Sequence, residues 1–155
     1  MKQKKILSRI TIDIPEEDHK LFKAMAAVQG KADAVYFGIG KLNMRSKSTY
    51  NFTENDLEKI VAICEENKMK AYVTLNTVIY DEDINEMYKS VSLCKEKGVH
   101  ALIASDIAVL EFAKEIGMET HISTQQNISN LAAVKFFSKD ADVMVLAREL
   151  RLDKV

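Results

Sequence analysis

The fold is decided by the segment Thr120-His121-Ile122-Ser123-Thr124-Gln125-Gln126-Asn127-Ile128-Ser129-Asn130. It starts with alternating apolar residues, continues as a dense polar turn, and is followed by apolar residues at helical spacing. A strand that ends in such a turn and feeds a helix is where an α/β protein usually binds a ligand. The last two residues can instead be explained as helix caps. One helix needs one cap, so Ser123, Gln125 and Asn127 are candidates for ligand binding.

The same unit recurs along the chain: a helix, a turn with Gly or Lys, an apolar strand and a polar exit. Residues 30–35, 98–102 and 141–144 are three copies of the turn and strand. Six strands are predicted to start near residues 9, 34, 70, 100, 120 and 142. Strands that alternate with helices pair in parallel through right-handed crossovers. Two architectures fit this pattern, an open doubly wound sheet or part of a (β/α)8 barrel.

Capping residues predict where several helices begin. Thr53 and Asp56 have the spacing of a capping box. Asp81 or Asp83 is expected to start the next helix, and Asp106 can cap the helix after that. Asp106 therefore has two interpretations, a plain N-cap or a carboxylate that binds a ligand.

Strands two to six each end beside polar side chains. In an open sheet such groups concentrate at one switch point, whereas in a barrel the carboxyl end of every strand borders the same site. Polar exits on five consecutive strands therefore favour a partial TIM-type (β/α) barrel with about six parallel strands over an open doubly wound sheet. The predicted substrate-binding residues at these exits are Asn43, Arg45, Asn76, Asp106, Gln125, Asn127, Arg148 and Glu149.

The length of 155 residues and the 47% hydrophobic content fit a single domain over residues 1–155. A complete barrel has eight strands and about 250 residues, so six strands leave the wall unfinished. We therefore expect an incomplete barrel or a fragment of a longer domain. Self-association or a partner chain is expected to cover the open edges of the sheet.

Charge and hydropathy limit the possible partners. The formal net charge of −1 excludes an overall basic field that would draw the protein to nucleic acid. No apolar run approaches the roughly 20 residues that span a bilayer, so no membrane partner is predicted. The basic start lacks the apolar stretch of a signal peptide, which predicts a cytoplasmic protein.

No metal or nucleotide site is predicted. Cys64 and Cys94 form no C-x-x-C motif and have no His at ligand spacing, so we interpret both as small buried hydrophobes on helices. The Gly-x-Gly sequence at residues 38–40 lacks the third glycine of a dinucleotide-binding loop, because Asn43 stands in its place.

Several segments together resemble the amino-terminal part of the collagenase-like peptidase family (family U, number thirty-two). The residues that carry the resemblance are 32–38, 43–45, 51–53, 72–76, 104–106, 121–125 with Asn127 and Asn130, and 146–150. The resemblance implies a TIM-barrel-like catalytic domain and peptidase activity, with collagen as a substrate of some members. Other members take part in hydroxylating bases of transfer or ribosomal RNA, or ubiquinone, and several carry an iron–sulfur cluster.

This sequence departs from the family pattern in two places. Family members open with a strand that ends in an Ala-Pro-x-Gly turn, whereas residues 13–16 here read Asp-Ile-Pro-Glu. The cysteine-rich signature of the family would lie beyond Val155. No cofactor is therefore predicted for this chain.

Three functions are compatible with these features, and a peptidase is the first expectation. Ser123 would be the nucleophile and His121 its base, since residues i and i+2 of a strand share a face. His121 can also be an ordinary strand residue. The substrate would be a peptide or a small anion.

The second hypothesis is an RNA-modifying protein, in which Arg45 and Arg148 would contact phosphates. The third hypothesis is a non-catalytic protein that binds a small anion or a partner subunit.

Overall fold

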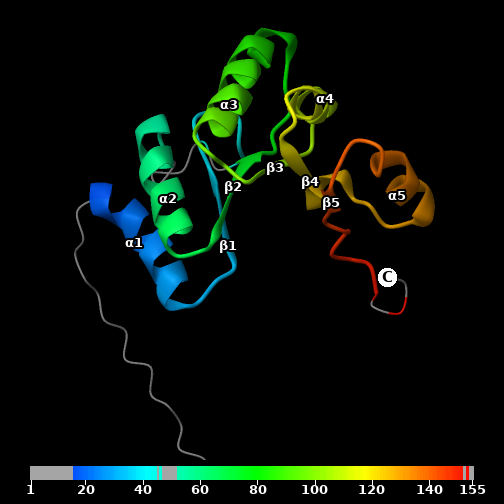
Figure 1. Ribbon diagram of the computed structural model, residues 1–155. Helices are drawn as coiled ribbons and strands as arrows, with labels where there is room; N and C mark the ends of the chain where they lie inside the picture. The colour runs from blue at the N-terminus through cyan, green and yellow to red at the C-terminus, as the bar shows by residue number, and fades with distance from the viewer. Residues whose placement is uncertain (1–15, 45, 47–51, 152, 154–155) are drawn as a thin grey trace, which may run out of the picture.

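The computed structural model describes residues 16–44, 46, 52–151 and 153. The predicted first strand and Arg45 lie outside this part. Helices and strands alternate along the chain (Figure 1). In order, the elements are α1 (Glu16–Gln29), β1 (Ala34–Gly38), α2 (Glu54–Glu66), β2 (Lys70–Leu75), the 3-10 turn η1 (Asp81–Asp83), α3 (Ile84–Glu96), β3 (Ala101–Ala104), α4 (Ile107–Glu115), β4 (Glu119–Ile122), the 3-10 turn η2 (Thr124–Gln126), α5 (Leu131–Phe137) and β5 (Val143–Met144).

The five strands form one parallel sheet in the order β1-β2-β3-β4-β5. Each crossover advances in the same direction, and right-handed crossovers of this kind place every helix on the same face. A doubly wound sheet reverses its strand order and carries helices on both faces. The helices here follow one side of the sheet in an arc (Figure 1). The prediction of a partial (β/α) barrel is therefore confirmed, with five of its strands in the described residues.

The two faces of the sheet have different surroundings. Ala71, Val73 and Leu75 of β2 are fully buried and join the core beneath the helices. Tyr72 and Thr74 alternate with them and line the opposite face, because successive side chains of a strand point to opposite sides. The helices contribute these core residues: Leu57, Ile60 and Val61 from α2, Met87 and Val91 from α3, and Val109 and Leu110 from α4.

The helices begin where the capping residues predict. The backbone N–H of Thr53 donates to Asp56 Oδ2 at 2.8 Å, which is half of the predicted capping box. Asp106 Oδ1 accepts from the N–H of Ala108 at 2.9 Å at the start of α4. At the start of α5, the N–H of Ala133 donates to Asn130 Oδ1 at 3.0 Å. Each cap satisfies a backbone N–H that has no partner within its helix.

The last strand is shorter than the pattern predicts. Residues 142–147 read as a strand, but β5 covers only Val143–Met144 and pairs with β4 alone in the described sheet. The N–H of Ala147 donates instead to the carbonyl of Ile128 at 2.8 Å, so the chain has left the sheet by that point. In the described residues, no helix has both the length and the apolar character needed to cross a bilayer.

Candidate functional site

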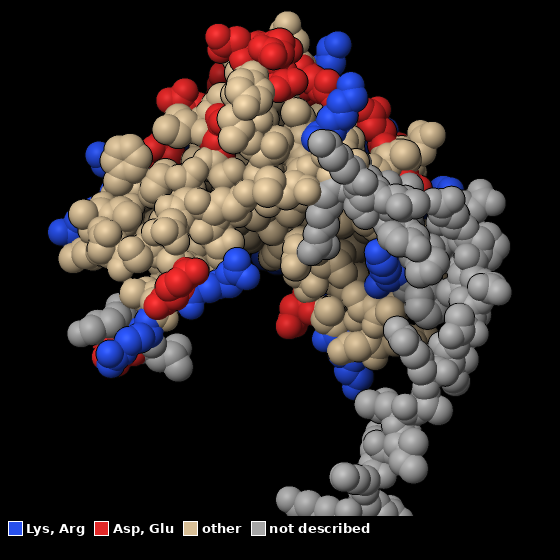
Figure 2. Space-filling view, turned by 180° about the vertical axis from the view of Figure 1, so that it is seen from behind, with Lys and Arg blue, Asp and Glu red and all other residues tan. Residues whose placement is uncertain are grey.

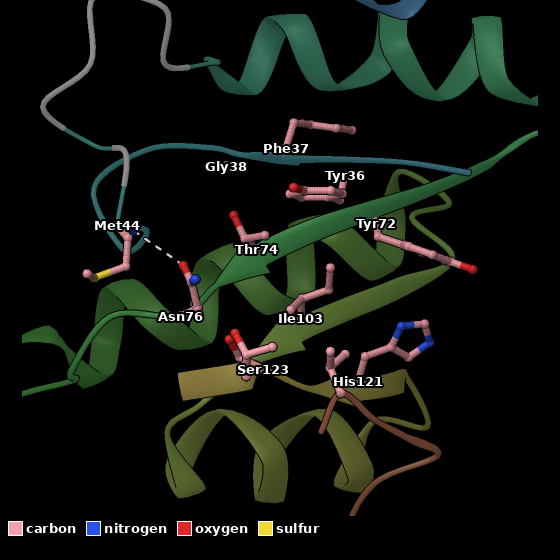
Figure 3. A pocket seen from close by; sticks show the side chains of 12 residues that line it. Tyr36, Phe37, Gly38, Met44, Tyr72, Thr74, Asn76, Ile103, His121 and Ser123 are labelled. Atoms are coloured by element: carbon pink, nitrogen blue, oxygen red, sulfur yellow. Dashed lines mark hydrogen bonds between the residues drawn. The ribbon is translucent and has the colours of Figure 1, made fainter. Parts of the chain in front are cut away.

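The face of the sheet turned away from the helices carries a cavity of about 500 Å³, which we call the cup (Figure 3). Alternate residues of β2 line it, because every second residue of a strand shares a face, and β1, β3 and β4 contribute further residues. Figure 2 shows that the described surface arches over a hollow, with charged side chains around its opening. The cup is lined by Tyr36, Phe37, Gly38, Met44, Tyr72, Thr74, Asn76, Ile103, His121, Ser123, Thr124 and Val145.

A second cavity of about 430 Å³, the side cavity, lies at the carboxyl ends of β2, β3 and β4. It shares Met44 and Asn76 with the cup. The backbone N–H of Met44 donates to Asn76 Oδ1 at 3.3 Å, so this pair borders both cavities (Figure 3). The other residues of the side cavity are Thr77, Val78, Ser105, Asp106, Gln125 and Gln126. Asn76 and Gln125, both predicted substrate-binding residues, therefore lie in one continuous region.

His121 and Ser123 line the same cup, but their hydrogen bonds lead elsewhere. His121 Nε2 lies 2.8 Å from Glu119 Oε1, and the ring makes an edge contact with Tyr72. Ser123 Oγ donates to Gln125 Oε1 at 3.2 Å and accepts from the Gln125 N–H at 3.4 Å. Figure 3 shows the imidazole directed away from Ser123. The predicted nucleophile–base pair is thus brought to one cavity without being hydrogen-bonded in this structure.

Asp106 is held by two backbone groups. One of its oxygens caps α4, and the other accepts from the N–H of Ile79 at 3.2 Å. The N-cap interpretation of Asp106 is therefore confirmed, and the same carboxylate also joins α4 to the segment after β2. It lines the side cavity with both oxygens already engaged.

Asn43 supports the loop that follows β1. The residue is only 2% exposed. Its Nδ2 donates to the carbonyl oxygens of Ile39 at 2.9 Å and Gly40 at 3.2 Å. Asn43 thus stabilises the backbone between Gly38 and Met44, two residues that line the cup.

Three further predicted residues are not among the described residues that line the two cavities. Asn127 is exposed and has a left-handed backbone with φ 53°, a conformation that Asn tolerates better than most residues. Arg148 and Glu149 are exposed after β5 and are not among the described residues lining the cup or the side cavity. Arg45 lies outside the described residues.

The cup is uncharged along its described lining. No Lys, Arg, Asp or Glu is among the described residues that line it. Asp106 is the one charged residue of the described side-cavity lining, and backbone N–H groups hold its carboxylate. The described part of the chain also shows no group of three or more His, Cys, Asp or Glu side chains placed to hold a metal ion. The arrangement suits a ligand bound by amide hydrogen bonds and aromatic contacts.

Sequence reasoning missed Tyr36, Tyr72, Thr74 and Glu119. It looked for polar residues where strands end, whereas these residues lie within strands. The alternation of β2, in which Tyr72, Thr74 and Asn76 share one face, is a signal that could have found Tyr72 and Thr74.

The sequence matches that of known proteins over most of its length. The model of Peptidase family U32 matches residues 19–155. A collagenase of Porphyromonas gingivalis is 53% identical over 131 residues, covering 84% of this chain and 32% of that protein. An uncharacterized protease of Methanocaldococcus jannaschii is 36% identical, covering 83% and 31%. The tRNA hydroxylation protein P1 of Bacillus subtilis is 32% identical, covering 83% and 31%. The chain spans about a third of the length of these curated relatives.

Solved structures share the fold at low sequence identity. A U32 peptidase has a TM-score of 0.62 at 12% identity, over 74% of this chain and 50% of that chain. The deoxyribose phosphate aldolase of Aeropyrum pernix has a TM-score of 0.64 at 17% identity, over 85% and 58%. Both likenesses support the partial barrel. Because the family match covers nearly all of the described residues, this chain belongs to peptidase family U32.

Proposed function

We propose that this chain forms the peptide-binding part of a peptidase, with an extended peptide lying across the cup and the side cavity. The observation that carries the proposal is the described lining of the cup, which is uncharged and combines aromatic, hydroxyl and amide side chains. Ligand sites of this kind bury a mostly apolar surface and orient the ligand with a few polar groups.

A peptide chain has the chemistry that this lining can satisfy. Each residue of an extended peptide carries an N–H donor and a C=O acceptor. Asn76 and Gln125 each offer both a donor and an acceptor. Tyr36 is 61% exposed and, with Tyr72, provides aromatic surface for side chains of the peptide. The 53% identity with a protein named a collagenase agrees with a polypeptide substrate.

Peptide hydrolysis also requires a group that transfers protons. His121 is the one imidazole among the described residues of the cup lining, and an imidazole nitrogen can accept or donate a proton. Ser123 remains the candidate nucleophile, although its hydroxyl is hydrogen-bonded to Gln125 here. Substrate binding would have to release that hydroxyl before it could attack a peptide carbonyl.

RNA-base modification is the second candidate, because a relative at 32% identity is named a tRNA hydroxylation protein. The exposed ring of Tyr36 could stack on an unpaired base. RNA binding, however, depends on cations that contact phosphates, and the described lining of the cup offers no Lys or Arg.

The test is binding and cleavage of gelatin and casein by the purified chain. We expect gelatin binding by the wild type, and binding that weakens about threefold to tenfold in Tyr36→Ala, since one ring contact is lost. Tyr88→Ala is the matched control, because Tyr88 is 43% exposed on α3 and packs against Phe112 on the helix side. Retention of RNA that falls steeply with salt, together with no gelatin binding, would favour the second candidate.

A further inference from the structure

The rings of Tyr72 and His121 meet although their strands are not neighbours. Tyr72 is on β2 and His121 on β4, with β3 between them. Adjacent strands lie about 4.8 Å apart, so β2 and β4 are separated by about 10 Å. The ring centroids are nevertheless 4.7 Å apart with an interplanar angle of 65°. Both side chains therefore lean toward each other over β3.

The residue of β3 beside Tyr72 is small, whereas Ile103 is the register partner of His121. Ala101 of β3 pairs with Tyr72 on one side and with Glu119 on the other, and it is fully buried. A methyl side chain leaves room for the two rings to converge. The Tyr72 ring then packs against the imidazole in an edge contact.

Glu119 holds the opposite end of the imidazole. Glu119 and His121 are two residues apart on β4 and share a face of the sheet. Their Nε2–Oε1 distance is 2.8 Å. An ionised carboxylate accepts hydrogen bonds and cannot donate them, so the proton of this bond belongs to Nε2. In a neutral imidazole the other nitrogen, Nδ1, is then an acceptor.

Nδ1 has no hydrogen-bond partner among the described residues. The His121 side chain is only 10% exposed, and within the described residues its one hydrogen bond is the bond to Glu119. A buried acceptor without a partner is unfavourable, and a bound ligand that donates a hydrogen bond would relieve it. His121 borders the cup, where the peptide of the proposed function would lie.

We propose that Glu119 is a positioning residue that fixes His121 in the Nε2-protonated form, so that Nδ1 accepts a hydrogen bond from an N–H of the peptide in the cup. The part that concerns the peptide rests on the proposed function. The part that concerns the proton on His121 stands independently of it.

The first experiment measures the proton position directly. Long-range ¹H–¹⁵N correlation spectra distinguish a protonated from an unprotonated imidazole nitrogen, and the His121→Asn spectrum assigns the signal. We expect a protonated Nε2 and an unprotonated Nδ1 in the wild type. In Glu119→Gln the preference should fall about tenfold, because a Gln amide can donate as well as accept. A protonated Nδ1 in the neutral wild-type ring would overturn the proposal.

His100 is the internal control for this spectrum. Its Nδ1 accepts from the N–H of Ala71 at 3.2 Å, so His100 must also carry its neutral-form proton on Nε2. The Glu119→Gln change leaves that bond intact. The His100 signal should therefore be the same in both proteins, which separates a local effect on His121 from partial unfolding.

The second experiment measures gelatin binding by the same proteins. Glu119→Gln should weaken binding about threefold to tenfold, the effect of one misdirected hydrogen bond. Glu115→Gln removes the same charge from the exposed surface of α4 and should bind like the wild type. If the wild type binds no gelatin, the proposed function fails, while the spectra still decide the proton position. Tight binding by Glu119→Gln with an unchanged spectrum would overturn the inference alone.

Discussion

The side-chain amide of Asn43 occupies the space that a β-carbon on Gly38 would need. Gly38 is the last residue of β1, and Asn43 lies in the loop that follows it. The absence of a side chain at residue 38 lets Asn43 reach the carbonyls of Ile39 and Gly40 from a buried position. This close approach shapes the loop that carries Met44 to the edge of the cup.

Gly38→Ala should therefore destabilise the protein by about 1–3 kcal/mol, the typical effect of forcing extra atoms into a packed site. Urea unfolding measures the change. Asn43→Ala should cost a similar amount, because it leaves the two carbonyls without the amide. The double variant should lose less than the sum of the two single variants, since removing Asn43 makes room for the new methyl group. A neutral Gly38→Ala would contradict this view of the loop.

Asp106 should matter for stability through its two backbone partners. Asp106→Ala removes the cap of α4 and the acceptor for the Ile79 N–H, and should cost about 1–2 kcal/mol in urea unfolding. Asp106→Asn should lie closer to the wild type, because Asn also caps helices well. Glu111→Ala, an exposed change on the same helix, is the control and should be nearly neutral. An Asp106→Ala protein as stable as Glu111→Ala would count against the capping role.

Asn76 should contribute to peptide binding from the border of the two cavities. Asn76→Ala removes the acceptor for the Met44 N–H and one amide of the lining. Gelatin binding, followed by a titration, should weaken about threefold to tenfold. Asn85→Ala, an exposed change on α3, should leave the affinity unaltered. Equal affinities of the two variants would remove Asn76 from the proposed site.

Cys94 should make stability depend on pH in the alkaline range. Burial raises the pKa of the Cys94 thiol from 9.0 to about 12. The folded state therefore favours the protonated thiol, and the stability it gains below the ordinary pKa is lost as the pH rises from about 9 toward about 12. The free energy of unfolding should fall over this range.

Cys94→Ala isolates this effect because it removes the titrating group. The variant should be less stable near neutral pH, owing to the space left in the core, but its stability should decline less steeply above about pH 9. Denaturant unfolding at several pH values compares the two slopes. Identical slopes would show that the Cys94 thiol does not titrate differently in the folded and unfolded states.

Local features of the sequence were enough to locate most elements. The caps at Thr53, Asp106 and Asn130 predicted helix starts that the structure has. A cap acts through side-chain bonds to the next few residues, so it is visible in a short stretch of sequence. The strand exits predicted Asn76, Ser123 and Gln125 near one region, because parallel strands end at the same side of a sheet.

The hydrogen-bond and ring-contact partners of individual side chains could not be predicted from local sequence features. The i+2 spacing pairs His121 with Ser123, but the same spacing in the other direction pairs it with Glu119, whose carboxylate is the hydrogen-bond partner in the structure. The orientation of the His121 ring, and so its choice of Glu119 over Ser123, depends on Tyr72, which contacts it across the intervening strand β3. No local pattern contains a contact between residues so far apart in the sequence.

The sequence alone determined the alternation of helices and strands, the parallel pairing and the approximate position of each element, because these follow from spacings within a few residues. The tertiary structure decided which face of each strand packs on the helices and which lines the cup. The sequences of β1 and β3 are mostly apolar on both faces, so their pattern does not distinguish the two faces. The strand order and the packing of α2, α3 and α4 determine which face of the sheet is buried beneath the helices. On the other face, His121 contacts both Tyr72 and Glu119.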